Sequence, residues 1–158
     1  MISSGFKYAF TAPLSLFKDN RARFIKAFKE KVTEFKNSIM MFEGNDLIPV
    51  DSTDHDYPFK QESYFYYLFG VKEPAFYATI NVETEKATLY YKPSPEIYKI
   101  WMTVLSKEQY IKKYELDTFV VDDLEGHIKS MNPSKIYVNL GVNSDSGTET
   151  QIPKFKWL

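Results

Sequence analysis

The strongest folding signal in the sequence is a pair of strand-like runs on either side of a short polar turn. The segment AFYATINVETEKATLYY, residues 75–91, carries alternating, β-branched and aromatic residues before and after Glu83–Lys86. Such runs are typical of strands, and a short polar connection between two of them indicates an antiparallel pair. The sequence therefore predicts a β-hairpin over residues 75–91.

An amphipathic helix is predicted upstream of the hairpin, in LFKDNRARFIKAFKEKVTEF, residues 16–35. Apolar residues recur there with a period near 3.6, at Phe17, Phe24, Ile25, Phe28, Val32 and Phe35. The opposite face is rich in Lys and Arg, which would suit a nucleic-acid or membrane surface. An acidic run at residues 43–62 cancels that charge, so we favour a solvated outer face of a helix packed on a sheet.

The remaining runs indicate alternating helices and strands. Strands are predicted in SIMMFEG, TFVVD and SKIYVNLGVN, at residues 38–44, 118–122 and 134–143. Helices are predicted at 95–104, at 106–114 after a Ser106/Gln109 capping box, and from Asp122 or Asp123 to Met131. This order predicts a mixed α/β sandwich.

Composition excludes several classes of protein. The chain has 158 residues with no Cys and only 2 His, which excludes disulfides, thiolate nucleophiles and imidazole-rich metal sites. A formal charge of −1 gives no overall field to attract a polyanion. No apolar run reaches the roughly 18 residues of a membrane span, and the N-terminus lacks a secretory signal. We therefore expect a cytoplasmic protein with no nucleic-acid or membrane partner.

Candidate chemistry is sparse. Asp51, Asp54, His55 and Asp56 lie within DSTDHDY and could bind a divalent ion or exchange protons. Contiguous polar residues in a turn-rich loop more commonly bond their own backbone, which is the interpretation we favour. His127 on the last predicted helix is expected to be a surface or half-buried histidine. No nucleophile elbow or phosphate loop occurs, so we predict no catalytic residue and no metal ligand in this chain.

Four collinear stretches resemble the N-terminal domains of the aminopeptidase P and prolidase family, and three of them resemble its eukaryotic-type prolidases. The block DHDYPFKQESYFYYLFG, Asp54 to Gly70, is similar to the family's Asp-x-x-Tyr-x-Phe-Arg-Gln-Asp/Glu-Ser motif. The other three are PLSLFKDNR, FGVKEPAFYATINVETEKATLY, and WMTVLSKEQYIKKYELD together with GVNSDSG. The resemblance implies the creatinase-type fold, a mixed sheet of about six strands with helices on both faces. It also implies that residues 59–70, strand-like by their aromatics, form mainly a loop and a short helical turn.

The resemblance implies that residues 1–158 are a single accessory domain of a Xaa-Pro dipeptidase. The family's catalytic pita-bread domain would hold two divalent ions, with manganese expected, and would cleave dipeptides that end in proline. The resemblance implies that the catalytic domain is absent from residues 1–158, so no cofactor is expected in these residues. Its own catalytic domain and a second copy, in a homodimer, are the partners that the resemblance implies.

Trp101 is the one residue to which the resemblance assigns a site role. It matches the position whose indole helps to wall the active-site entrance of the partner subunit, and anchoring the 95–104 helix in the core is the alternative. Lys60 stands where the family often has Arg. A lysine cannot form the two parallel hydrogen bonds by which a planar guanidinium holds a carboxylate, so a carboxylate-binding role at this position is in doubt.

Two other functions stay open: a stand-alone binding module without the catalytic half, and an RNA-binding module based on the basic helix and the aromatics.

Overall fold

The computed structural model describes residues 12–100, 102–142 and 144–149 of the chain. Its α-helices are α1 (Leu14–Lys31), α2 (Ser63–Phe69), α3 (Lys107–Tyr114) and α4 (Leu124–Met131). Two short 3₁₀ helices are η1 (Glu96–Ile100) and η2 (Val121–Asp123). The strands are β1 (Ser38–Glu43), β2 (Phe76–Asn81), β3 (Ala87–Tyr91), β4 (Asp117–Val120) and β5 (Lys135–Val138).

The five strands form one mixed sheet in the order β4-β3-β2-β1-β5. The central strands β1, β2 and β3 pair antiparallel, while β4 and β5 lie parallel to their neighbours at the two edges. The predicted hairpin is confirmed, with Phe76 opposite Tyr91 and Ile80 opposite Ala87. The predicted fold class is confirmed as well, with five strands in the described ranges where about six were expected.

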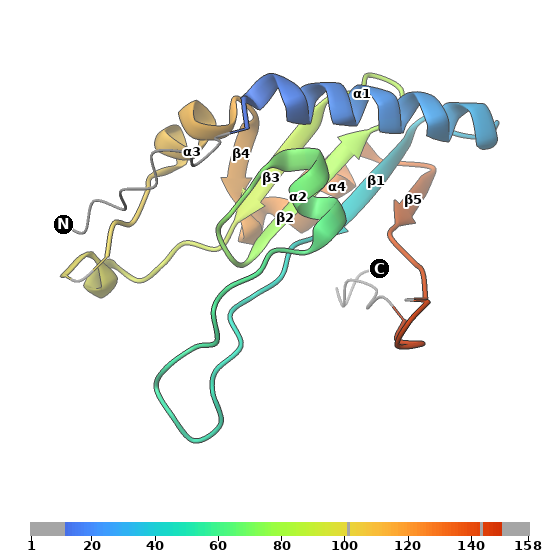
Figure 1. Cartoon of the computed structure of the whole chain (residues 1–158). Helices are drawn as coiled ribbons and strands as arrows, with labels where there is room; N and C mark the ends of the chain where they lie inside the picture. Colours follow the sequence, from blue (N-terminus) through green and yellow to red (C-terminus); the bar gives the residue numbers. More distant parts are fainter. Residues whose placement is uncertain (1–11, 101, 143, 150–158) are drawn as a thin grey trace.

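Helices cover both faces of the sheet, as predicted. On one face α1 lies across the sheet beside α2 (Figure 1), and Ile25 and Phe65 of these helices join the larger core cluster. On the other face α4 packs Leu124 and Ile128 against Ile39 and Met41 of β1. Each face of the sheet therefore has its own apolar core.

The helix α2 replaces the strand that its aromatic residues suggest. The Glu62 carboxylate accepts hydrogen bonds from the backbone N–H groups of Tyr64 and Phe65, which caps the first turn. Gly70 ends the helix in the left-handed conformation, at φ +68°. The short helical turn implied by the family resemblance is confirmed.

Two helix predictions were wrong: the end of the first helix, and the length and type of the helix at 95–104. α1 ends at Lys31 and not at Phe35, because Val32 is already extended and the chain must turn before β1 begins at Ser38. The predicted 95–104 helix is only the short 3₁₀ helix η1, which buries none of its residues. A short helix whose apolar side has nothing to pack against gains too little to propagate.

The capping box at the start of α3 is confirmed and can be tested. Ser106 Oγ accepts from the Gln109 N–H at 3.3 Å, and the Ser106 N–H donates to Gln109 Oε1 at 2.8 Å. We expect Ser106→Ala to lower the free energy of unfolding by about 1 kcal/mol, measured by urea denaturation. As a control, Ser130→Ala in the last turn of α4 removes one exposed hydrogen bond, from Ser130 Oγ to the His127 carbonyl oxygen, and should change the free energy of unfolding by less than about 0.5 kcal/mol. Equal effects of both substitutions would contradict the capping role.

Candidate functional site

The acidic loop singled out from the sequence is an exposed turn. Thr53 Oγ1 donates to the Val50 carbonyl oxygen at 2.9 Å, and the Val50 N–H donates to the carbonyl oxygen of His55 at 2.8 Å. His55 Nε2 lies 3.7 Å from Asp54 Oδ1, and both side chains are more than 80% exposed. Within the described ranges no group of three His, Cys, Asp or Glu side chains could hold a metal ion. These contacts fit the favoured structural interpretation of the loop.

His127 is half-buried, as predicted, and belongs to a hydrogen-bonded network inside the fold. Its Nδ1 lies 2.6 Å from the Tyr90 hydroxyl, which also lies 3.3 Å from Thr79 Oγ1. Burial raises the pKa of Tyr90 to about 12, although the hydrogen bond with Thr79 lowers it. The phenol therefore stays protonated at neutral pH, and the network ties α4 to the sheet. Sequence reasoning missed this pairing because no local signal joins residues 37 positions apart.

Trp101 lies outside the described residues, so its proposed role is not tested by the structure. The residues on either side of it are strongly exposed: Ile100 is 71% exposed and Met102 is 49% exposed. Ile97 and Tyr98 of η1 are exposed as well. We call Glu96–Ile100 together with Met102 the exposed segment. Its four large apolar side chains are 42–71% exposed.

A second surface feature is the projecting loop, residues 45–58, which extends away from the sheet (Figure 1). A bridge between Pro49 and Asp56 and a 2.9 Å hydrogen bond from the Tyr57 N–H to the Ile48 carbonyl oxygen hold its two limbs together. Its exposed apolar side chains are Leu47, Ile48 and Tyr57. The loop thus adds a second apolar surface outside the core.

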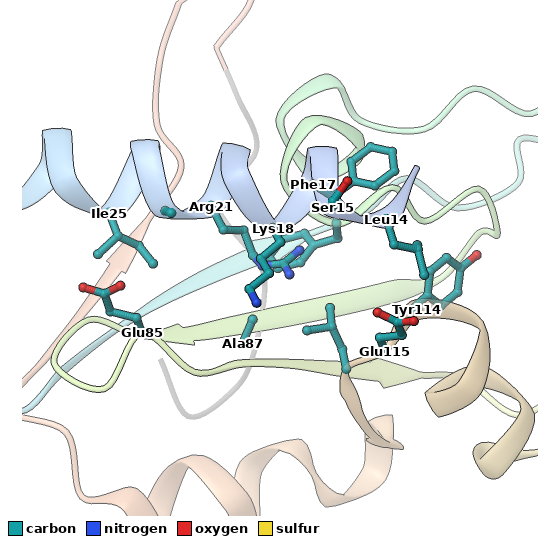
Figure 2. Close-up of a pocket in the computed structure, with 13 residues that line it drawn as sticks. Leu14, Ser15, Phe17, Lys18, Arg21, Ile25, Glu85, Ala87, Tyr114 and Glu115 are labelled. Carbon is teal, nitrogen blue, oxygen red and sulfur yellow. The ribbon is translucent and has the colours of Figure 1, made fainter. Parts of the chain in front are cut away.

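A groove of about 560 Å³ opens between α1, the β2–β3 turn, β3 and the α3–β4 connection, and we call it the α1 groove (Figure 2). Its apolar walls include Leu14, Ile25 and Leu116. Lys18 and Arg21 project into it from α1, and Glu115 lies on the opposite wall, at the end of α3. The groove therefore has a mixed lining of apolar side chains and charged groups of both signs.

Arg21 is the most buried charge in this groove. Its Nη1 donates to the Leu68 carbonyl oxygen at 2.7 Å, and its guanidinium carbon lies 6.0 Å from the centre of the Phe69 ring. Burial lowers the pKa of Arg21 from its ordinary value, but an arginine so far above neutrality stays charged. Within the described ranges Arg21 forms no ion pair with a carboxylate. One N–H group of the Arg21 guanidinium thus bonds the end of α2, and the other N–H groups have no carboxylate partner among the described residues.

The groove also contains a buried tyrosine, Tyr114. The tyrosines with raised pKa values are held protonated: burial, followed by its hydrogen bond to Glu73, raises the pKa of Tyr114. Such groups are hydrogen-bond donors, and they are poor bases at neutral pH. Among the helices that the structure describes, none has both the length and the apolar character of a membrane-spanning segment. The exposed segment, the projecting loop and the α1 groove are three features of the described residues that are open to contact with another molecule.

Comparison with known proteins gives a consistent set of relatives. The family "Aminopeptidase P, N-terminal domain" matches residues 17–137. The chain is similar to the human Xaa-Pro dipeptidase, with 36% identity over 138 residues, 86% of this chain and 28% of that protein. It is also similar to the mouse Xaa-Pro dipeptidase, with 34% identity over 148 residues, 92% of this chain and 30% of that protein. The chain thus spans less than a third of the length of these relatives.

Solved structures share the fold. A putative aminopeptidase P from Bacillus anthracis superposes with a TM-score of 0.69 at 22% identity, over 89% of this chain and 34% of that one. Aminopeptidase P from E. coli with the inhibitor Pro-Leu superposes with a TM-score of 0.67 at 17% identity, over 85% of this chain and 31% of that one. In both cases the matched part is about a third of a longer chain, and the likeness concerns the fold alone.

Proposed function

The chain belongs to the family of aminopeptidase P N-terminal domains, and from this premise we propose that it is the non-catalytic N-terminal domain of a Xaa-Pro dipeptidase. The observation that carries the proposal is the similarity to Xaa-Pro dipeptidases over 86–92% of this chain. Because the chain spans only 28–30% of those relatives, the chemistry would belong to the rest of such a protein. That part would hold the two divalent ions, with manganese expected, and would hydrolyse dipeptides that end in proline.

The domain would contribute by binding the catalytic domain of a partner subunit and by shaping the entrance to its active site. We assign the exposed segment to a contact with the catalytic domain of a partner subunit in a homodimer, where it would narrow the active-site entrance. Ile97, Ile100 and Met102 lie close together in the sequence and are each about half exposed or more, and clusters of exposed apolar side chains commonly mark interfaces. Trp101 lies between Ile100 and Met102 in the sequence, so it would belong to the same contact. A wall of apolar side chains excludes water and longer peptides from a site.

The exposed segment gives a direct test through Ile100→Asp. Ile100 is 71% exposed, so we expect the stability of this chain to change by no more than about 0.5 kcal/mol. In the protein with its catalytic domain, a carboxylate buried in the contact should lower glycyl-proline hydrolysis about ten-fold or more and weaken the dimer. Hydrolysis is measured by proline release, and the dimer by sedimentation.

The matched control for Ile100→Asp is Leu140→Asp, because Leu140 is 64% exposed and lies outside the exposed segment, the projecting loop and the α1 groove. It should leave hydrolysis and dimer formation unchanged. If Ile100→Asp also leaves both unchanged, the exposed segment is not the contact. A fall in stability of this chain alone would show instead that Ile100 supports the fold.

The coding sequence downstream of Leu158 tests the domain assignment itself. We expect it to continue into a metallopeptidase domain with two Asp, one His and two Glu as metal ligands. A stop codon directly after Leu158 would contradict the proposal and favour a stand-alone binding module.

A further inference from the structure

We propose that the α1 groove is a binding site for a small zwitterionic peptide or amino acid, with the ligand carboxylate against Arg21 and Lys18 and the ligand ammonium toward Glu115. The inference goes beyond the proposed function, because it concerns a site formed by this chain alone and requires no catalytic domain. It is carried by the charges and walls of the groove (Figure 2).

The cationic side of the groove is equipped for a carboxylate. Arg21 uses Nη1 to hold the Leu68 carbonyl oxygen, which leaves further N–H donors of its fork available. Lys18, one helical turn earlier on α1, also forms no ion pair with any residue the structure describes. Because Arg21 is partly buried, its charge is less screened by solvent than an ordinary surface charge. Two adjacent cations without a carboxylate favour an anionic group from outside.

The opposite wall supplies the complementary charge. Glu115 follows the last turn of α3 in the left-handed conformation, at φ +52°, and its carboxylate forms no ion pair across the described ranges. The other acidic residue of the groove, Glu85, is already paired with Lys29 at 2.7 Å. Glu115 is therefore the carboxylate that can receive a cation from a ligand.

The size and walls of the groove limit the ligand further. About 560 Å³ lies within the roughly 300–1,000 Å³ of small-molecule sites. Leu14, Ile25 and Leu116 line the groove alongside the charged groups. An apolar side chain would fit against these walls, so a dipeptide such as alanyl-leucine matches the groove better than a polar zwitterion.

The test is a titration of the isotopically labelled 158-residue chain with alanyl-leucine, followed by backbone amide shifts. We expect saturable shifts concentrated in residues 14–25 and 115–116, which weaken as salt is added. Alanyl-leucine amide lacks the carboxylate and N-acetyl-alanyl-leucine lacks the ammonium, so both should bind at least about five-fold more weakly. Equal binding of the amide would overturn the role of Arg21 and Lys18, and equal binding of the acetylated peptide would overturn that of Glu115.

Substitutions distinguish specific binding in the α1 groove from non-specific attraction to the positive charge of α1. Lys18→Gln and Glu115→Gln each remove one charge without breaking a hydrogen bond or ion pair among the described residues, and each should weaken binding about five-fold. Arg21→Lys keeps the charge and loses the fork, so it should weaken binding at least as much. Lys26→Gln, on the exposed side of α1, is the matched control and should have no effect.

Two results would overturn the proposal. The first is the absence of saturable shifts in residues 14–25 with alanyl-leucine. The second is equal weakening by Lys26→Gln and Lys18→Gln, because it would show attraction to the basic helix in general. Failure of this test leaves the domain assignment untouched, since that assignment is tested by the downstream sequence and by hydrolysis.

Discussion

Replacing Phe65 with alanine is expected to lower the free energy of unfolding by about 3–5 kcal/mol. Phe65 is fully buried in α2, and its ring centre lies 5.0 Å from that of Phe69. Removing the ring would leave a cavity at the centre of the larger core cluster, between α2 and the sheet. Native domains have a free energy of unfolding of only about 5–15 kcal/mol, so a loss of this size would remove a large part of the stability of the domain.

The neighbouring residue gives the control for Phe65→Ala. Tyr64 precedes Phe65 in the same helix, but its side chain is 58% exposed. We expect Tyr64→Ala to change stability by less than about 1 kcal/mol. Chemical denaturation of both variants measures the difference. Similar losses in the two variants would contradict the orientation of α2, since a rotation of the helix would exchange the two side chains.

Replacing Gly70 with alanine is expected to cost about 2–5 kcal/mol, for two reasons. Gly70 adopts φ +68°, where a β-carbon is strained by about 1–2 kcal/mol. The added β-carbon would also overlap sterically with the ring of the buried Phe17, so α1 and α2 would have to move apart. The close approach of these two helices therefore depends on the missing side chain.

Gly126→Ala is the matched control for Gly70→Ala. Gly126 lies in α4, where an added β-carbon would meet nothing within 4 Å, and its φ is not positive. The same substitution there should stabilise the protein by roughly 0.5–1 kcal/mol, because alanine is the better helix former. Thermal unfolding compares the two variants, and a neutral Gly70→Ala would show that α1 and α2 can separate without cost.

Features with a local sequence signal were predicted well. The hairpin over residues 75–91 follows from two β-rich runs and a polar turn, and Ser106 with Gln109 indicated the start of α3. These signals depend on residues close together in the chain, so they can be read without the fold. The helical α2 was different, since its residues favour a strand and the family resemblance corrected that preference.

Features that depend on tertiary contacts were not predicted. The apolar spacing of residues 95–104 indicated a helix, but none of the residues of η1 is buried against the rest of the domain. The pairing of Tyr90 with His127 and the position of Arg21 opposite Glu115 arise only when separate elements meet. Sequence periodicity indicates which side of an element is apolar, but it does not indicate what that side will meet.

The proposed non-catalytic role is tested most directly by measuring glycyl-proline hydrolysis by the purified 158-residue chain, supplied with manganese and followed by proline release. We expect no proline release above the blank from this chain, and hydrolysis only when the chain is joined to the proposed catalytic domain. Metal-dependent turnover that co-purifies with the 158-residue chain and disappears with a chelator would contradict the non-catalytic role.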